Sequence, residues 1–170
     1  AQEREQFGKP IHNFAGVYEM LANMRAKTDA IRSLLYETAR GIDIYKAIED
    51  KAKYGSITPE EKQKLRQYQK LSDILTPMLK LFSSEYANQI TYDAIQVHGG
   101  SGFMKDYAVE RMYRDARILT IYEGTSQLQT VAAIRHVTTG TYLKQIRHYE
   151  SLPINPEFDS IRKRLITMTN

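Results

Sequence analysis

The sequence predicts an all-α protein, an antiparallel up-and-down four-helix bundle with a short C-terminal helical extension. The first observation is that two long stretches, Phe14 to Ile48 and Leu71 to Val97, have apolar residues at every third or fourth position, which is the spacing of a helix face. Turn-forming segments rich in glycine or proline then separate these stretches from two shorter helical ones. Helices joined by short connections pack most naturally as antiparallel neighbours.

The first long helix is expected from about Phe14 to about Ile48. Pro10 precedes it, at a point where the chain must turn or start a helix. More than thirty residues at a rise of 1.5 Å each would span roughly 50 Å, so this helix needs a partner of similar length. Its apolar stripe consists of Phe14, Val17, Tyr18, Leu21, Met24, Ile31, Leu34 and Leu35.

The second long helix has the clearest start in the chain. Thr58 supplies an N-cap, Pro59 suits the first turn, and Glu61 completes a capping box. Pro77 lies inside this helix and predicts a bend, because its ring removes one hydrogen bond. Three glycines in residues 99–102 end the helix. Its apolar stripe consists of Leu71, Leu75, Met78, Phe82, Tyr86, Ile90, Ala94 and Val97.

Two shorter helices complete the predicted bundle. One is expected from about Asp106 to Arg117, and the other from about Ser126 to Val137 or beyond. The first should direct Val109, Met112, Tyr113 and Ala116 inward. Two prolines between residues 151 and 156 predict a break, and a short basic helix should follow from about Glu157. The predicted division is therefore a bundle domain over residues 1–140 and an extension over residues 141–170.

Composition excludes several classes of protein. Of the 170 residues, 42% are hydrophobic and 26% charged, which is typical of a globular protein, and no apolar run is long enough to span a membrane. The absence of cysteine excludes disulfides and thiolate chemistry. Four histidines without a Glu-x-x-His pair argue against a di-iron bundle, so no metal site is expected. Residues 51–70 carry six Lys or Arg against two Glu, which favours a solvated helix face over an anion-steering surface. We expect neither a membrane nor a nucleic-acid partner.

The stretch ILTIYEGTSQLQ, residues 118–129, places Glu123 just before a predicted helix N-terminus. The unpaired N–H groups and positive dipole end of that helix would favour the carboxylate anion, and so a proton acceptor. An acidic residue at a helix start is also ordinary capping. The residues alone leave both interpretations open.

Four segments resemble the C-terminal helical domain of the acyl-CoA dehydrogenases and occur in that family's order. They are EREQFGKPI (3–11), QVHGGSGF (96–103), VERMYRDARI (109–118) and IYEGTSQLQ (121–129). The resemblance covers residues 1 to about 140. Family members are flavoproteins with an N-terminal helical domain and a middle β domain. Because the chain starts at Ala1 without methionine, we expect it to be a piece of a longer protein.

The resemblance implies a catalytic role for Glu123 as general base. The base would remove the α-proton of a fatty acyl-CoA while a β-hydride passes to FAD, giving trans-2-enoyl-CoA. Tyr122 and Gly124 are expected beside the acyl-CoA, although packing is the plainer interpretation of Tyr122. The implied partners are an electron-transfer flavoprotein, which accepts the electrons, and further copies of the chain in a dimer or a homotetramer.

The resemblance also implies an FAD site. Arg4, Gln6 and Phe7 lie in the motif whose members meet FAD phosphates across a dimer interface, and an Arg guanidinium suits a pyrophosphate. A surface salt bridge is the alternative for Arg4. The family also has an FAD-contacting loop, in which small residues let backbone N–H groups approach the cofactor. The matching residues here are Gln96, Val97, His98, Gly99 and Gly100. Thr125 and Gln127 match flavin-contacting positions, although Thr125 could serve only as a cap.

The family resemblance leaves alternatives to the dehydrogenase open. One is an acyl-CoA oxidase, in which oxygen reaches the reduced flavin. Another is a non-catalytic assembly protein or a DNA-associated member, against which the intact YEGTSQ segment argues. Longer members carry an extra C-terminal helical region, so residues 141–170 leave the acyl chain length open. Fatty acid β-oxidation is the expected pathway, in the cytoplasm of a bacterium or the mitochondrial matrix of a eukaryote.

Overall fold

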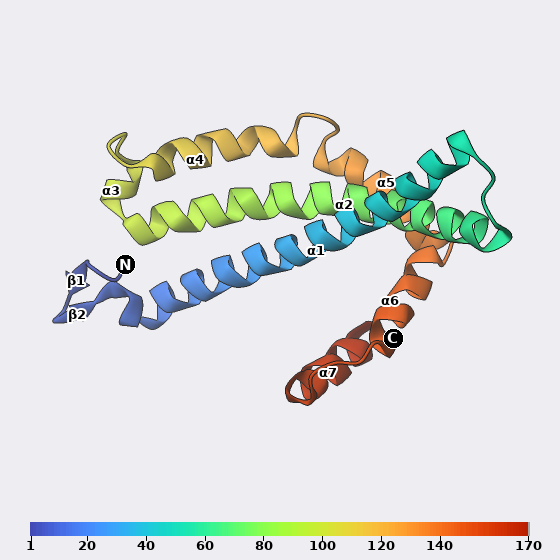
Figure 1. Ribbon diagram of the computed structural model, residues 1–170. Helices are drawn as coiled ribbons and strands as arrows, with labels where there is room; N and C mark the ends of the chain where they lie inside the picture. The colour runs from blue at the N-terminus through green and yellow to red at the C-terminus, as the bar shows by residue number, and fades with distance from the viewer. Residues whose placement is uncertain (170) are drawn as a thin grey trace.

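The computed structural model describes residues 1–169, and these are almost entirely helical (Figure 1). This confirms the all-α class, and the four expected bundle helices are present as α1, α2, α4 and α5. A small antiparallel hairpin near the N-terminus was not predicted. The elements are β1 Glu5–Gln6, β2 Lys9–Pro10, η1 Ile11–Asn13, α1 Ala15–Tyr54, α2 Pro59–His98, α3 Gly100–Phe103, α4 Ala108–Ala116, η2 Arg117–Thr120, α5 Ser126–Thr138, α6 Thr141–Ser151, η3 Pro156–Phe158 and α7 Asp159–Thr169.

Helices α1 and α2 are the long antiparallel pair that the sequence predicts, each with 40 residues. The predicted capping box starts α2: the Glu61 N–H donates to Thr58 Oγ1 at 3.2 Å, and the Thr58 N–H donates to Glu61 Oε2 at 2.9 Å. A buried glycine in α1 brings the helices close, because a Cβ on Gly41 would lie 3.4 Å from Ser72 Oγ. The helix α2 continues through Pro77, and the predicted bend stays a prediction.

The buried core is centred on α2. Leu71, Ile74 and Leu75 are each at most 6% exposed, and Leu34 of α1, Tyr68 and Met78 of α2 and Tyr142 of α6 pack against them. Further along the predicted stripe Phe82 is 38% exposed. In α4 the prediction holds for Val109 and Ala116, which are buried, but is wrong for Met112, which is exposed. Tyr113 is 41% exposed, although its ring lies 6.2 Å from that of Tyr92 in α2. Helical periodicity predicts which residues share a face, but not how far a neighbour covers that face.

Helices α4 and α5 follow one another along α2. The Asn88 side chain of α2 donates to the Ala116 carbonyl oxygen at the end of α4, at 2.8 Å. A second contact fixes the register: Ser126, at the start of α5, donates to the Glu85 carboxylate of α2. The bundle is therefore three rows deep, with α2 between α1 and the α4–α5 row, and the connection between α4 and α5 lies against the middle of α2 (Figure 1).

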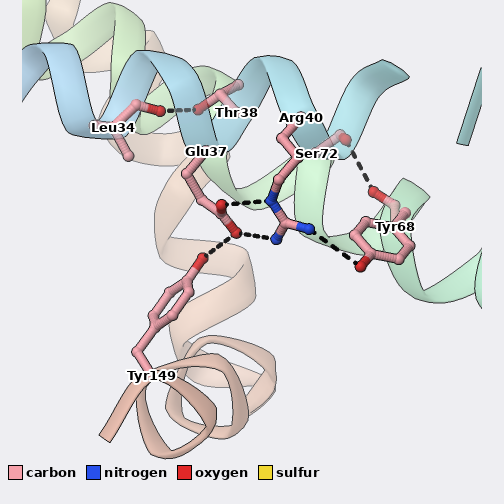
Figure 2. A network of polar contacts seen from close by, with 7 residues as sticks. All are labelled: Leu34, Glu37, Thr38, Arg40, Tyr68, Ser72 and Tyr149. Carbon is pink, nitrogen blue, oxygen red and sulfur yellow. Dashed lines mark hydrogen bonds and ion pairs between the residues drawn. The ribbon is translucent and has the colours of Figure 1, made fainter. Parts of the chain in front are cut away.

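The C-terminal extension is joined to the long helices by a polar network (Figure 2). Tyr149 of α6 donates to Glu37 Oε1 at 2.9 Å, and Glu37 also accepts two hydrogen bonds from Arg40. The guanidinium reaches Tyr68 Oη of α2 at 3.4 Å. The bonds from Arg40 lower the pKa of Glu37, while burial, with the bond to Glu37, raises the pKa of Tyr149 to about 12. One network thus connects α1, α2 and α6.

Within residues 1–169, no helix combines the length and the apolar character that a membrane crossing requires. Over the same residues, no group of three or more His, Asp or Glu side chains gathers to bind a metal ion.

Candidate functional site

Glu123 lies in the turn between η2 and α5, and its backbone is in the left-handed region with φ +52°. Gly124 follows with φ +92°. Before them, the N–H groups of Ile121 and Tyr122 donate to the Ile118 carbonyl oxygen at 2.9 and 3.1 Å, which closes the preceding helical turn. Left-handed geometry is uncommon for a residue with a Cβ and costs about 1–2 kcal/mol. The surrounding structure must therefore impose this conformation on Glu123.

The turn is held by side chains on both sides. Gln129 Nε2 donates to the Glu123 carbonyl oxygen at 3.2 Å, and Lys80 Nζ donates to the Leu119 and Gly124 carbonyl oxygens at 2.8 Å each. At the start of α5, Ser126 is buried and hydrogen-bonded to Glu85. These contacts come from two helices, so the segment that carries Glu123 is fixed to the bundle.

The N-cap of α5 is Thr125, and this changes the expected role of the helix terminus. Thr125 Oγ1 accepts from the Leu128 N–H at 3.4 Å. The Glu123 carboxylate is exposed, and among residues 1–169 it makes no hydrogen bond or ion pair. Among the described residues no helix N–H group hydrogen-bonds this carboxylate, because the Thr125 hydroxyl, two residues later, takes the capping position. The carboxylate remains available to accept a proton from a bound molecule.

The structure brings Tyr122, Glu123, Gly124, Thr125 and Gln127 together around this turn. Tyr122 is 47% exposed, and its ring lies 5.8 Å from Lys80 Nζ. An open pocket of about 420 Å³ adjoins the turn on the side of Thr125 and Gln127. It is lined by Glu85, Asn88, Arg117, Thr120, Ile121, Thr125, Ser126 and Gln127. The turn therefore combines an unpaired carboxylate with a pocket of mainly polar lining.

A second cluster forms at the C-terminal end of α2. Arg4 Nη1 donates to the His98 carbonyl oxygen at 3.1 Å, so the N-terminal motif and the glycine loop meet within one chain. The alternative for Arg4 was a surface salt bridge. Among the described residues Arg4 forms no such ion pair. Gly99 has φ +63°, and a Cβ there would lie 3.1 Å from Arg4 Nη1. A glycine at this position therefore lets the guanidinium lie against the backbone.

The remaining predicted residues surround this cluster. Gln6 is exposed, and its amide donates to the Glu5 carbonyl oxygen at 2.8 Å. Phe7 forms the tip of the β1–β2 hairpin with Gly8; it is 93% exposed, and φ is +50°. Positive φ at both residues is typical of a type I′ hairpin turn. On α2, Gln96 is exposed and Val97 half-buried, while Gly100 has open space where a Cβ would be.

The two clusters are separate within one chain. Ser126 contacts α2 at Glu85, and Arg4 contacts it at His98. His98 lies thirteen residues after Glu85 in the same helix, which corresponds to roughly 20 Å. The structure therefore places Arg4 with His98 and Gly99, and Thr125 with Glu123, but it does not bring the two sets together.

Three residues that hold the Glu123 turn were not predicted from the sequence: Lys80, Glu85 and Gln129. A signal was present in α2, where polar residues recur at helical spacing on one face: Lys80, Ser84, Asn88 and Thr91. Ser84 is only 4% exposed, and Asn88 binds the end of α4. A polar line along an otherwise apolar helix can therefore mark the face that holds irregular backbone.

Comparisons with known proteins identify the family of this chain. A sequence profile of the family described as "Acyl-CoA dehydrogenase, C-terminal domain" matches residues 1–54 and 60–138. Subunit CarC of the caffeyl-CoA reductase-Etf complex of Acetobacterium woodii is 38% identical over 85% of this chain and 31% of its own length. Acryloyl-CoA reductase (NADH) of Anaerotignum propionicum is 42% identical over 79% of this chain and 28% of its own length.

A solved structure extends the likeness to three dimensions. The acyl-CoA dehydrogenase of Bacillus anthracis, complexed with FAD, superposes with a TM-score of 0.63 and 28% identity, over 93% of this chain and 28% of that one. The chain thus spans about a third of the length of the curated relatives that it matches, 31% for CarC and 28% for acryloyl-CoA reductase. It belongs to the acyl-CoA dehydrogenase family and carries that family's C-terminal domain.

Proposed function

We propose that the protein to which this chain belongs interconverts an acyl-CoA thioester and its trans-2-enoyl-CoA on bound FAD, with Glu123 handling the α-proton. The observation that carries the proposal is the Glu123 turn. An exposed carboxylate without a protein partner stands on a backbone held at positive φ by contacts from two helices. Backbone strain that the surrounding structure maintains is characteristic of functional sites. Membership of the family supports this reaction over others open to a carboxylate.

Glu123 would accept the proton from the α-carbon of the thioester, with the carbon–hydrogen electron pair moving into the new double bond. FAD, when bound, supplies the acceptor for the hydride that leaves the β-carbon. Proton and hydride together account for the two hydrogens and two electrons that the acyl group loses. Glu123 must be unprotonated and fixed beside the α-carbon for this step, and the hydrogen bonds at both flanks of the turn fix its backbone. Tyr122 and Gly124, on either side of the base, would contact the acyl group.

The opposite direction is a second candidate, favoured by the names of two relatives. CarC is named as a subunit of a caffeyl-CoA reductase-Etf complex, and the protein of Anaerotignum propionicum as an acryloyl-CoA reductase. In that direction a protonated Glu123 would return the proton to the α-carbon as a general acid, because forward and reverse reactions share one transition state. The geometry of the turn suits both directions equally.

The residues of the second cluster fit a cofactor that carries phosphates. Among the described residues, Arg4 donates one guanidinium N–H to the His98 carbonyl oxygen, and its side chain is exposed. A planar guanidinium beside backbone without a Cβ, at Gly99 and Gly100, suits a pyrophosphate. Thr125 and Gln127, at the 420 Å³ pocket, would contact the flavin ring system. Gln6, Phe7, Gln96, Val97 and His98 complete the residues proposed to contact FAD.

The roughly 20 Å between the two clusters supports a homo-oligomer, dimer or tetramer, in which one flavin is held by the Arg4 cluster of one subunit and the Glu123 turn of another. Exposed apolar residues on α5 support burial of that helix in a larger assembly: Leu128, Val131, Ile134 and Val137. The name of CarC, a subunit of a reductase-Etf complex, supports an electron-transfer flavoprotein as redox partner.

Turnover by the full-length protein tests this proposal. The purified flavoprotein is given acyl-CoA substrates of several chain lengths, with an artificial electron acceptor in the absence of oxygen, and separately with oxygen alone. A dehydrogenase forms enoyl-CoA only with the acceptor, whereas comparable product with oxygen alone indicates an oxidase. Reduction of an enoyl-CoA by chemically reduced enzyme measures the second direction. Absence of product under every condition contradicts the proposal and favours a non-catalytic member of the family.

A further inference from the structure

Lys80 connects the middle of α2 to both ends of the segment that carries Glu123. Its Nζ lies 2.8 Å from the carbonyl oxygen of Leu119, in η2, and 2.8 Å from that of Gly124, just before α5. The side chain is half-buried. One ammonium group therefore fixes the positions where the turn begins and where it ends.

The charged ammonium group of Lys80 donates its hydrogen bonds to main-chain carbonyl oxygens. Within residues 1–169 no carboxylate lies within ion-pair distance of Nζ, and the nearest described aromatic ring is that of Tyr122, at 5.8 Å. Withdrawing an ammonium from water is unfavourable unless strong hydrogen bonds replace the lost hydration. Two charge-assisted bonds to carbonyl oxygens meet that requirement, and each is stronger than a bond between neutral groups. The lysine is thus a component of the turn.

These bonds act on the residue whose conformation is strained. Glu123, at φ +52°, lies between the two carbonyls that Lys80 holds, and its own carbonyl oxygen accepts from Gln129 at 3.2 Å. Without Lys80, the Leu119 and Gly124 carbonyl oxygens would each lose a charged donor, and residues 119–124 would be free to relax toward ordinary φ values. A displacement of about 1 Å in a catalytic group can lower a rate by about 100-fold.

We propose that Lys80 is a positioning residue for Glu123, which holds the base in register with the α-carbon through the two carbonyl bonds. The inference rests on the proposed function, because it requires Glu123 to be the proton acceptor. Lys80 touches neither the acyl group nor the flavin in this account. Its effect is confined to the rate of the proton-transfer step, and substrate affinity and flavin retention should depend on other residues.

The test uses the full-length flavoprotein with Lys80→Met, and with Lys70→Met as a matched control, because Lys70 is an exposed lysine on the same helix. The limiting rate of flavin reduction by acyl-CoA is measured anaerobically per bound flavin, with the half-saturating substrate concentration and the FAD content. Lys80→Met should lower the limiting rate at least about tenfold, with little change in half-saturation, while Lys70→Met matches the wild type. Lys80→Arg should give an intermediate rate, because a guanidinium keeps the charge but not the geometry.

A Lys80→Met protein that loses FAD or thermal stability, yet reduces each remaining flavin at the wild-type rate, overturns the inference, because a purely structural residue behaves in that way. If Lys80→Met does not fold, Lys80→Arg decides, and a limiting rate within twofold of the wild type overturns the inference. Glu123→Gln, measured in parallel, separates the two proposals. If Glu123→Gln reduces flavin normally, the proposed function fails and the inference with it. If Glu123→Gln is inactive and Lys80→Met is fast, only the inference fails.

Discussion

The side-chain amide of Gln129 donates a 3.2 Å hydrogen bond to the carbonyl oxygen of Glu123, from one turn inside α5. The same amide nitrogen would lie 2.7 Å from a Cβ on Gly124, where φ is +92°. The hydrogen bond that holds the proposed base thus occupies the space that any side chain at position 124 would require. Position 124 therefore favours glycine for two reasons: φ is +92°, and a Cβ would displace the Gln129 amide from Glu123.

Gly124→Ala should lower the free energy of unfolding by more than the roughly 1–2 kcal/mol that left-handed geometry costs a residue with a Cβ. Gly140→Ala is the matched control, because Gly140 has φ +69° and no atom within 4 Å of a Cβ. Denaturant unfolding of both variants isolates the clash from the backbone strain. Adding Gln129→Ala to Gly124→Ala should bring the loss close to that of Gly140→Ala. Equal losses in the two single variants would show that the Gln129 contact is unimportant.

Glu123→Gly should leave the free energy of unfolding unchanged, or raise it by up to about 1 kcal/mol, while turnover by the full-length protein is lost. Glycine adopts φ near +52° without steric cost, although it gains entropy in the unfolded chain. Glu123→Ala keeps a Cβ at the same φ and should be less stable than Glu123→Gly. Thermal and denaturant unfolding measure both. A Glu123→Gly protein that is less stable than Glu123→Ala would contradict the account of strain at this residue.

Arg4→Ala in the full-length protein should weaken FAD retention, because it removes the guanidinium proposed to bind the pyrophosphate. Arg25→Ala is a suitable control: Arg25 is an exposed arginine of α1 whose ion pair with Asp29, 2.6 Å long, lies on the surface. Ultrafiltration followed by absorbance of the bound flavin gives the dissociation constant. The expected change is about tenfold or more for Arg4→Ala and none for Arg25→Ala. Unchanged FAD affinity in Arg4→Ala would count against the second cluster as a cofactor site.

Tyr149→Phe should lower the free energy of unfolding at pH 7 by about 1 kcal/mol, because the Glu37 carboxylate loses a hydrogen-bond donor. The pKa of Tyr149 is raised from 10.0 to about 12, chiefly by burial. A raised pKa means that the fold favours the neutral phenol, so this contribution is complete below pH 10 and is lost as the pH rises toward 12. The stability difference between wild type and Tyr149→Phe should therefore shrink above pH 10. Tyr36→Phe, at an exposed position of α1, is the control and should change the free energy of unfolding at pH 7 by less than about 0.5 kcal/mol.

Helix boundaries could be predicted closely from the sequence because the signals that set them are local. Thr58, Pro59 and Glu61 start α2 where predicted, and Gly99 ends it. The extent of burial was less predictable. Met112 and Tyr113 lie at inward spacing in α4 yet are exposed, because the helix α4 is covered on one side only. The hairpin at Phe7 and Gly8 was missed because strands of two residues carry no alternating pattern.

In the candidate site, too, features set by neighbouring residues could be predicted, and features set by distant contacts could not. The position of Glu123 before a helix was readable from the glycine and the threonine that follow it, and the structure has α5 begin at Ser126 as predicted. Lys80 lies 39 and 44 residues before the carbonyls that it binds, so no local pattern could pair them. The positive φ of Glu123 depends on such distant contacts, and it too could not be read from the residues nearby.

The central claim is that Glu123 removes the α-proton of an acyl-CoA, and anaerobic flavin reduction by Glu123→Gln in the full-length protein tests it most directly. Glutamine keeps the shape of the side chain and its exposed position but cannot accept the proton. Glu123→Gln should retain bound, yellow FAD, and acyl-CoA should reduce this flavin at least about 100-fold more slowly than in the wild type. Flavin reduction within a few-fold of the wild-type rate would contradict the claim.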